Sequence, residues 1–174
     1  MMNLIVTCAR HLEGDTEDEL IDILGELGDS DVKISVSSMS GIITAETKLD
    51  PIQVVRKMKE MLLDEPWSIR YCLRVIPIET VIETGIEEIE KTISSMSNQI
   101  EEKESYRILI EKRNSDISSK EVITKVANKI KNKVSLDFPD KIILIEILGI
   151  ITGISIIKKS DILSLEKTKR SMSD

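Results

Sequence analysis

The chain has 174 residues, of which 41% are hydrophobic and 32% are charged, and its net charge at pH 7 is −7. This length allows one large or two small domains, and the net negative charge argues against a protein that binds nucleic acid over its whole surface. The N-terminus lacks the pattern of a signal peptide. The most apolar run, residues 142–157, is shorter than the roughly 20 residues that span a bilayer and is interrupted by Glu146. We therefore expect a cytoplasmic protein.

The first part of the chain, residues 1–80, predicts the order strand, helix, strand, strand, helix, strand. Thr16 and Glu19 have the spacing of a capping box for the first helix, and Asp50, followed by a proline, is a typical cap for the second. The last strand is expected at residues 69–76. This βαββαβ order is typical of the ferredoxin-like fold, an antiparallel four-stranded sheet with two helices on one face.

From Thr84 the pattern changes to helix, strand, helix, strand, strand. Thr84 with Glu87, and Ser118 with Glu121, have capping-box spacing ahead of apolar residues at helical intervals. The elements after the first helix are expected at residues 106–110, 119–132, 141–148 and 151–157.

Residues that could carry chemistry are scarce. His11 is the only histidine, and Cys8 and Cys72 share no motif, so neither a histidine-based metal site nor a Ser-His-Asp triad is indicated. No glycine-rich loop has phosphate-binding spacing. We expect a protein that is not an enzyme and that holds no cofactor or metal.

Charge is divided unevenly along the chain. Residues 1–100 hold 9 basic and 19 acidic residues, whereas residues 105–170 hold 14 basic and 8 acidic residues. Such an asymmetry indicates either an anionic partner for the basic half or neutralisation of one half by the other.

The basic half resembles a THUMP domain, the RNA-binding module of several tRNA-modifying enzymes. The resemblance is carried by the segments YRILIEKR, VSLDFPDKIILIEI and GISIIKK, together with the helix that Ser118 opens. Upstream, the segments NLIVTCARHLEGDTEDELIDILGELGD, GIITAETKLDPIQVVRKMKE and LRVIPIETVIETGIEEIE resemble standalone archaeal THUMP proteins related to the eukaryotic adaptor for tRNA cytidine N4-acetylation.

The resemblance implies an α+β protein with two domains and a tail. We expect a ferredoxin-like domain at residues 1–80, a THUMP domain (α-β-α-β-β, mixed sheet) at residues 81–165 and a C-terminal tail at residues 166–174. It also implies a tRNA-binding adaptor that grips the acceptor stem and 3′ end. Because the chain stops at residue 174, the chemistry would come from a separate enzyme, such as an RNA cytidine acetyltransferase.

The candidate RNA-binding residues are cations at strand ends and on the helix that follows Ser118, together with that helix's N-terminus, which attracts phosphate. They are Arg107, Lys112, Arg113, Ser118, Ser119, Lys120, Lys125, Lys141, Lys158 and Lys159.

The few aromatic residues shape the expected mode of recognition. Tyr106 and Phe138 alone would make a poor platform for stacking bases, which predicts recognition by backbone charge and acceptor-end shape. An alternative from another class is a protein-interaction or small-ligand regulatory module of ferredoxin-like type.

Overall fold

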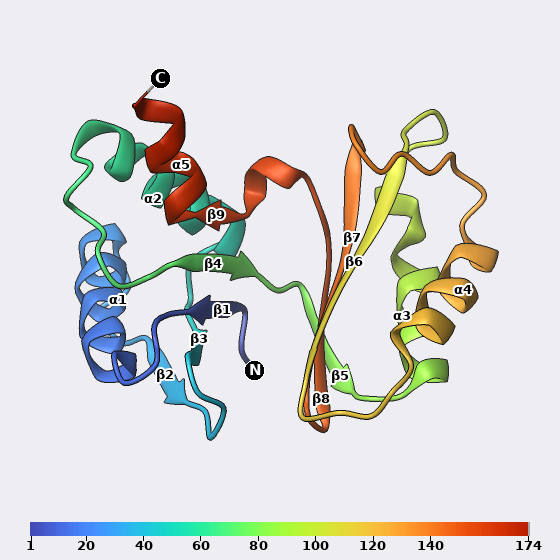
Figure 1. The fold of residues 1–174 in the computed structure, drawn as a ribbon, viewed down its shortest axis with the longest axis horizontal. Coiled ribbons are helices and arrows are strands. Elements are labelled where there is room, and N and C mark those ends of the chain that lie inside the picture. Colours follow the sequence, from blue (N-terminus) through green and yellow to red (C-terminus); the bar gives the residue numbers. More distant parts are fainter. Residues whose placement is uncertain (174) are drawn as a thin grey trace. The chain divides into compact units, whose positions relative to one another are not determined.

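The computed structural model describes residues 1–173 and divides into two compact units (Figure 1). The first unit comprises Met1–Ile78 together with the C-terminal segment from Ser160, and the second comprises Glu79–Lys159. Within residues 1–173, no helix is both long and apolar enough to cross a membrane.

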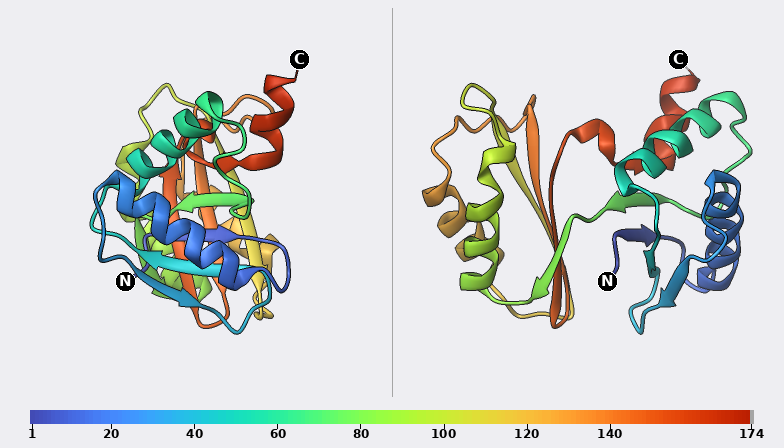
Figure 2. Two further views of the ribbon diagram at one scale, coloured as in Figure 1. Left: turned by 90° about the vertical axis from the view of Figure 1, so that its left-hand side faces the viewer. Right: turned by 180° about the vertical axis from the view of Figure 1, so that it is seen from behind.

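The first unit is a five-stranded antiparallel sheet in the order β2-β3-β1-β4-β9, and Figure 2 (left view) shows α1 and α2 on one face of it. Its core is formed by the apolar stripes of the two helices and alternate residues of the central strands. The elements are β1 (Leu4–Thr7), α1 (Glu13–Leu27), β2 (Lys33–Val36), β3 (Ile42–Glu46), α2 (Pro51–Asp64), β4 (Arg74–Pro77), β9 (Leu163–Ser164) and α5 (Leu165–Met172).

The capping box predicted at Thr16 and Glu19 is wrong, because α1 begins three residues earlier, at Glu13. Thr16 Oγ1 instead donates to the carbonyl of Leu12 (2.6 Å). The Glu19 carboxylate accepts hydrogen bonds from three successive backbone N–H groups, those of Arg70, Tyr71 and Cys72, at 2.8–3.0 Å. These N–H groups are therefore not available to a sheet, which is why the predicted strand at 69–76 is shortened to β4.

The C-terminal segment differs from the tail expected at residues 166–174. Strand β9 pairs antiparallel with β4, and α5 follows it directly. Asp161, just ahead of β9, accepts hydrogen bonds from the Arg56 guanidinium on α2 at 3.3 and 3.4 Å, and Lys59 of α2 donates to the carbonyl of Ser160. These contacts, with the burial of Leu163 and Leu165, join the segment to the first unit.

The second unit is a mixed four-stranded sheet in the order β5-β8-β7-β6, in which β6 and β7 are parallel and the other pairs antiparallel. Helices α3 and α4 cover one face of this sheet (Figure 1). Isoleucines of β7 and β8 pack against these helices in the core. The elements are β5 (Thr80–Glu83), α3 (Ile86–Met96), a 3-10 turn η1 (Ser97–Gln99), β6 (Tyr106–Arg113), α4 (Ser119–Lys129), β7 (Lys141–Leu148), β8 (Ile151–Ile157) and a second 3-10 turn η2 (Lys159–Asp161), which leads into the first unit's C-terminal segment.

Two helix caps were predicted in this unit, and one of them is confirmed. Ser118 caps α4, its Oγ accepting from the N–H of Glu121 (3.2 Å), as predicted. The capping box predicted at Thr84 is wrong, because the N-cap of α3 is Gly85 and Thr84 Oγ1 lies 2.8 Å from Thr152 Oγ1 on β8. The side chain that was expected to cap a helix therefore joins two strands.

Candidate nucleic-acid interface

Nine of the ten candidate RNA-binding residues lie at two opposite ends of the second sheet, and the tenth, Lys125, lies on α4. Strands β6 and β7 begin, and β8 ends, at what we call the upper end, which is uppermost in Figure 1. The opposite end, where β6 and β7 finish, is the lower end. Arg107 and Lys112 are five residues apart on β6, about 16 Å at the usual rise of an extended strand.

The candidates at the upper end are Arg107, Lys141, Lys158 and Lys159. Arg107 Nη1 donates to the carbonyl of Leu136 (3.0 Å), which leaves further N–H groups of the guanidinium for a ligand. Lys141 has a different role: its side chain is only 17% exposed and its Nζ binds Glu104 Oε1 (3.0 Å) and the carbonyl of Gln99 (2.9 Å). It holds the structure of this end, while Lys158 and Lys159 follow β8 on the exposed surface.

Three further exposed lysines belong to the upper end, and they were not among the predicted residues. Lys103, Lys131 and Lys133 lie in the two loops that precede β6 and follow α4. Asn132 joins these loops, because its Nδ2 donates to the carbonyls of Glu101 (2.8 Å) and Glu104 (3.0 Å). A sequence shows that both loops carry lysine, but not that a side-chain amide brings them together.

The carboxylates of the upper end are partly occupied by neighbouring donors. Glu104 binds Lys141, and a hydrogen bond from the backbone N–H of Glu101, reinforced by Lys141, lowers the pKa of Glu104. Asp140 accepts from the N–H and the hydroxyl of Ser105 at 2.8 and 3.1 Å, which lowers the pKa of Asp140. Three exposed acidic residues, Glu101, Glu102 and Asp137, also lie in these loops, but the cations of this end other than Lys141 outnumber them: Lys103, Arg107, Lys131, Lys133, Lys158 and Lys159.

The lower end holds Lys112, Arg113, Ser118, Ser119 and Lys120, and two of its three cations, Lys112 and Arg113, bind other groups of the protein. Lys112 Nζ donates to the carbonyl of Ile117 (2.7 Å), which closes the loop between β6 and α4. Arg113 Nη1 lies 3.7 Å from Oε2 of Glu146, a buried carboxylate of β7.

The start of α4 is also a poorer phosphate site than its sequence indicates. Carboxylates from Glu87, Glu88, Asp116 and Glu121 line the hollow beside it. Their negative charge opposes the attraction of a helix N-terminus for an anion. The predicted phosphate contact at Ser118 and Ser119 therefore lacks a favourable field.

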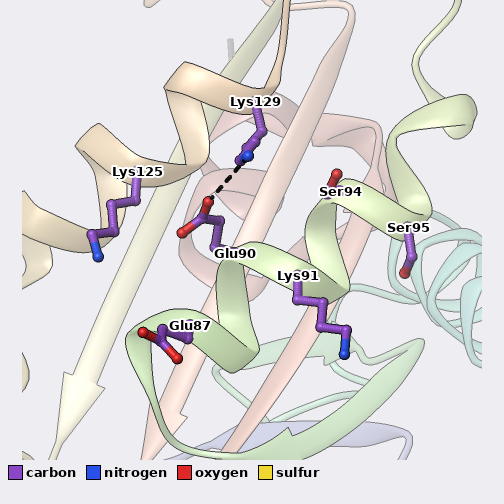
Figure 3. Close-up of a pocket in the computed structure, with 7 residues that line it drawn as sticks. All are labelled: Glu87, Glu90, Lys91, Ser94, Ser95, Lys125 and Lys129. Carbon is purple, nitrogen blue, oxygen red and sulfur yellow. Dashed lines mark ion pairs between the residues drawn. The ribbon is translucent and has the colours of Figure 1, made fainter.

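Lys125 lines both this hollow and a groove of about 610 Å³ between α3 and α4 (Figure 3). Figure 3 shows Lys129 reaching from α4 to Glu90 on α3, with 3.7 Å between Nζ and Oε1. Acidic and basic side chains alternate along this groove, so it does not extend either cluster. The candidate residues therefore do not form one cluster in the second unit.

The two aromatic residues of this region have opposite environments. Tyr106 is 1% exposed and packs in the core beneath α3 and α4, whereas Phe138 is 88% exposed in the loop ahead of β7. Only Phe138 is therefore placed to meet a ligand.

The second unit corresponds to a known family. Residues 83–157 match the family model described as THUMP domain. The α+β architecture predicted from sequence, a ferredoxin-like unit followed by a THUMP unit, is confirmed. No curated protein matches the chain.

Several solved structures share the fold. PH1313 from Pyrococcus horikoshii has 20% sequence identity and a TM-score of 0.63, with 91% of this chain and 55% of that chain covered. TrmN from Thermus thermophilus has 14% identity and a TM-score of 0.62, covering 90% and 45%. A 4-thiouridine synthetase in complex with RNA and ATP has 11% identity and a TM-score of 0.52, covering 91% and 42%. The chain thus spans about half of these proteins' lengths or less.

Proposed function

We propose that the THUMP domain at residues 83–157 binds tRNA at its upper end, and that the chain serves as a non-catalytic adaptor for a separate tRNA-modifying enzyme. The observation that carries the proposal is the family match, because THUMP domains are associated with tRNA binding. The shared fold with a synthetase that was solved in complex with RNA supports the same ligand class.

Charge favours the upper end of the second unit as the place where RNA binds. The half-buried Arg107 and the exposed cations Lys103, Lys131, Lys133 and Lys159 lie there on loops and strand ends that hydrogen bonds hold in place. Phosphate contacts from such groups supply most of the affinity of sequence-independent RNA binding. The groove between α1 and α2 in the first unit is instead lined by six carboxylates, which repel phosphate.

The environments of the thiol and carboxylate side chains that could take part in catalysis support a binding role instead. Burial, with the nearby Glu19 carboxylate, raises the pKa of the Cys72 thiol well above its ordinary value, so this thiol stays protonated and a weak nucleophile. Glu13, Glu19 and Asp29 each accept backbone N–H hydrogen bonds, which commits them to the fold. No group of three or more His, Cys, Asp or Glu side chains within residues 1–173 is arranged to hold a metal ion.

Binding of tRNA should depend strongly on salt. With three to five phosphates neutralised, the logarithm of the association constant is expected to fall with the logarithm of salt concentration at a slope of about −2 to −4. Fluorescence anisotropy of labelled tRNA, titrated with the full chain between 50 and 300 mM salt, measures this slope. A slope near zero, or no binding at 50 mM salt, would contradict the proposal.

The partner enzyme is proposed from the resemblance to standalone archaeal THUMP proteins related to the tRNA cytidine N4-acetylation adaptor. An RNA cytidine acetyltransferase supplied with tRNA, acetyl-CoA and ATP is expected to form N4-acetylcytidine at least 10-fold faster when the chain is present. Mass spectrometry of digested tRNA measures the product. Equal rates with and without the chain would rule out this enzyme as the partner but would not contradict the proposed binding of tRNA.

A further inference from the structure

The loop ahead of β7 exposes apolar side chains that the fold does not use. Val134, Leu136 and Phe138 are alternate residues of this loop, and Leu136 and Phe138 are 64% and 88% exposed. Apolar side chains stabilise the fold when they are removed from water, so the exposed ring contributes little to folding. A lone exposed apolar residue is ordinary, but three on one loop form a candidate binding surface.

Hydrogen bonds on both sides fix the conformation of this loop. Ser135 N donates to the carbonyl of Tyr106 (2.9 Å), and Phe138 N donates to Ser135 Oγ (3.3 Å). Asp140, two residues after Phe138, accepts from the N–H of Ser105 (2.8 Å). The ring is therefore presented from an ordered backbone, which reduces the entropy lost when a ligand binds.

The charges around the ring select the kind of ligand. Arg107 donates to the carbonyl of Leu136, two residues from Phe138, so its guanidinium lies beside the loop. Lys133 is an exposed residue of the same loop, five positions before Phe138, and its carbonyl accepts from Tyr106 N (3.0 Å). An aromatic face in a loop with neighbouring cations suits a nucleotide, whose base stacks on the ring while its phosphate meets the cations. A base within a helix has no free face to offer, so the nucleotide must be unpaired.

We propose that Phe138 stacks on a base of the unpaired 3′-terminal segment of the bound RNA, with Arg107 and Lys133 contacting the adjoining phosphates. This inference rests on the proposed function and deepens it, because it names the part of the RNA that reaches this loop. It also revises the expectation that recognition uses backbone charge and shape alone.

The test compares intact tRNA with tRNA that lacks its four unpaired 3′-terminal nucleotides. The variant Phe138→Ala is expected to bind intact tRNA about 5- to 100-fold more weakly than the wild-type chain, the range for losing one stacked base. It should bind the truncated tRNA as the wild type does. Phe138→Trp should restore binding of intact tRNA, because it returns an aromatic face to the loop.

The matched control is Ile150→Ala, which removes an 85% exposed apolar side chain from the lower end of the same sheet. It should leave both affinities unchanged. A 2-aminopurine base near the 3′ end gives a second measurement, since stacking on the wild-type chain quenches its fluorescence and Phe138→Ala should abolish the quenching.

Three outcomes overturn the inference. Phe138→Ala could bind intact tRNA as tightly as the wild type does, which would mean that the apolar loop contacts a protein partner and not the RNA. It could weaken both tRNAs equally, which would mean that the ring only supports the loop. If the wild-type chain binds neither tRNA, the proposed function fails together with this inference, whereas the first two outcomes leave the proposed function standing.

Discussion

Replacing Arg107, Lys131 and Lys133 together with glutamine is expected to lower the affinity for tRNA about 100-fold or more. Each of these upper-end cations can neutralise a phosphate, and a charged hydrogen bond contributes about 1.5–3 kcal/mol. Losing two of the three contacts would therefore already lower the affinity by this factor. The salt slope should also become less steep by about 2 to 3, because fewer counterions are released. The loss should be similar for all tRNAs, since phosphate contacts carry no sequence information.

The matched control removes the same number of charges from the predicted residues that lie away from the upper end. The variant Lys112→Gln, Lys120→Gln and Lys125→Gln is expected to change affinity less than 5-fold, because Lys112 is bound to the carbonyl of Ile117 and Lys125 shares a hollow with carboxylates. Circular dichroism and thermal unfolding show whether both variants are folded. Equal losses of affinity in the two variants would indicate that the RNA contacts both ends of the sheet. A loss of affinity only in the control would indicate that it binds at the lower end.

The elements that the sequence predicts well are those with local causes. Asp50 caps α2 by accepting from the N–H groups of Ile52 and Gln53, and Ser118 caps α4 in the same way. Both are set by residues within one turn of the helix. The edge strands β5 and β9, with four and two residues, were not predicted, because such short segments have too little alternation to mark them as strands.

The interpretation of Glu19 fails for a related reason. Its position three residues after a threonine is typical of a capping box, but its carboxylate is used by backbone groups about fifty residues away in sequence. A long-range acceptor and a local cap leave the same pattern in a sequence. The distinction depends on which loop folds back onto α1, and that is a property of the whole sheet.

The candidate interface is predicted in composition but not in arrangement. Arg107 lies near the start of β6 and Arg113 at its end, and the two look equivalent in sequence. Arg107 donates to a loop carbonyl, however, whereas Arg113 pairs with the buried Glu146 on the neighbouring strand. Tyr106 and Phe138 likewise differ only in which of them faces the core. Pairing of strands and of side chains across loops decides both cases, and neither is encoded in local spacing.

Replacing Asp29 with asparagine is expected to lower the free energy of unfolding of the first unit by about 3 kcal/mol at pH 7. Asp29 is 2% exposed, and its carboxylate accepts from Thr47 Oγ1 (2.6 Å) and from the N–H groups of Lys48 and Asp31 (both 3.0 Å). Hydrogen bonds to a charged group contribute about 1.5–3 kcal/mol each, and an amide can replace only part of this set. Urea unfolding followed by circular dichroism measures the change, and Asp31→Asn, an exposed neighbour, is the control that should change it by less than about 0.5 kcal/mol.

The effect of Asp29→Asn should also depend on pH, in a direction fixed by its hydrogen bonds. The hydrogen bond from Thr47 and those from the backbone lower the pKa of Asp29 below its ordinary value of 3.8, so the folded chain binds this proton less readily than the unfolded chain. The stabilisation is therefore complete above about pH 4–5 and is lost as the pH falls through the lowered pKa, where Asp29 becomes neutral like asparagine. The difference in free energy of unfolding between wild type and Asp29→Asn should shrink towards pH 2, and a difference that stays constant from pH 7 to pH 2 would mean that the Asp29 charge contributes nothing.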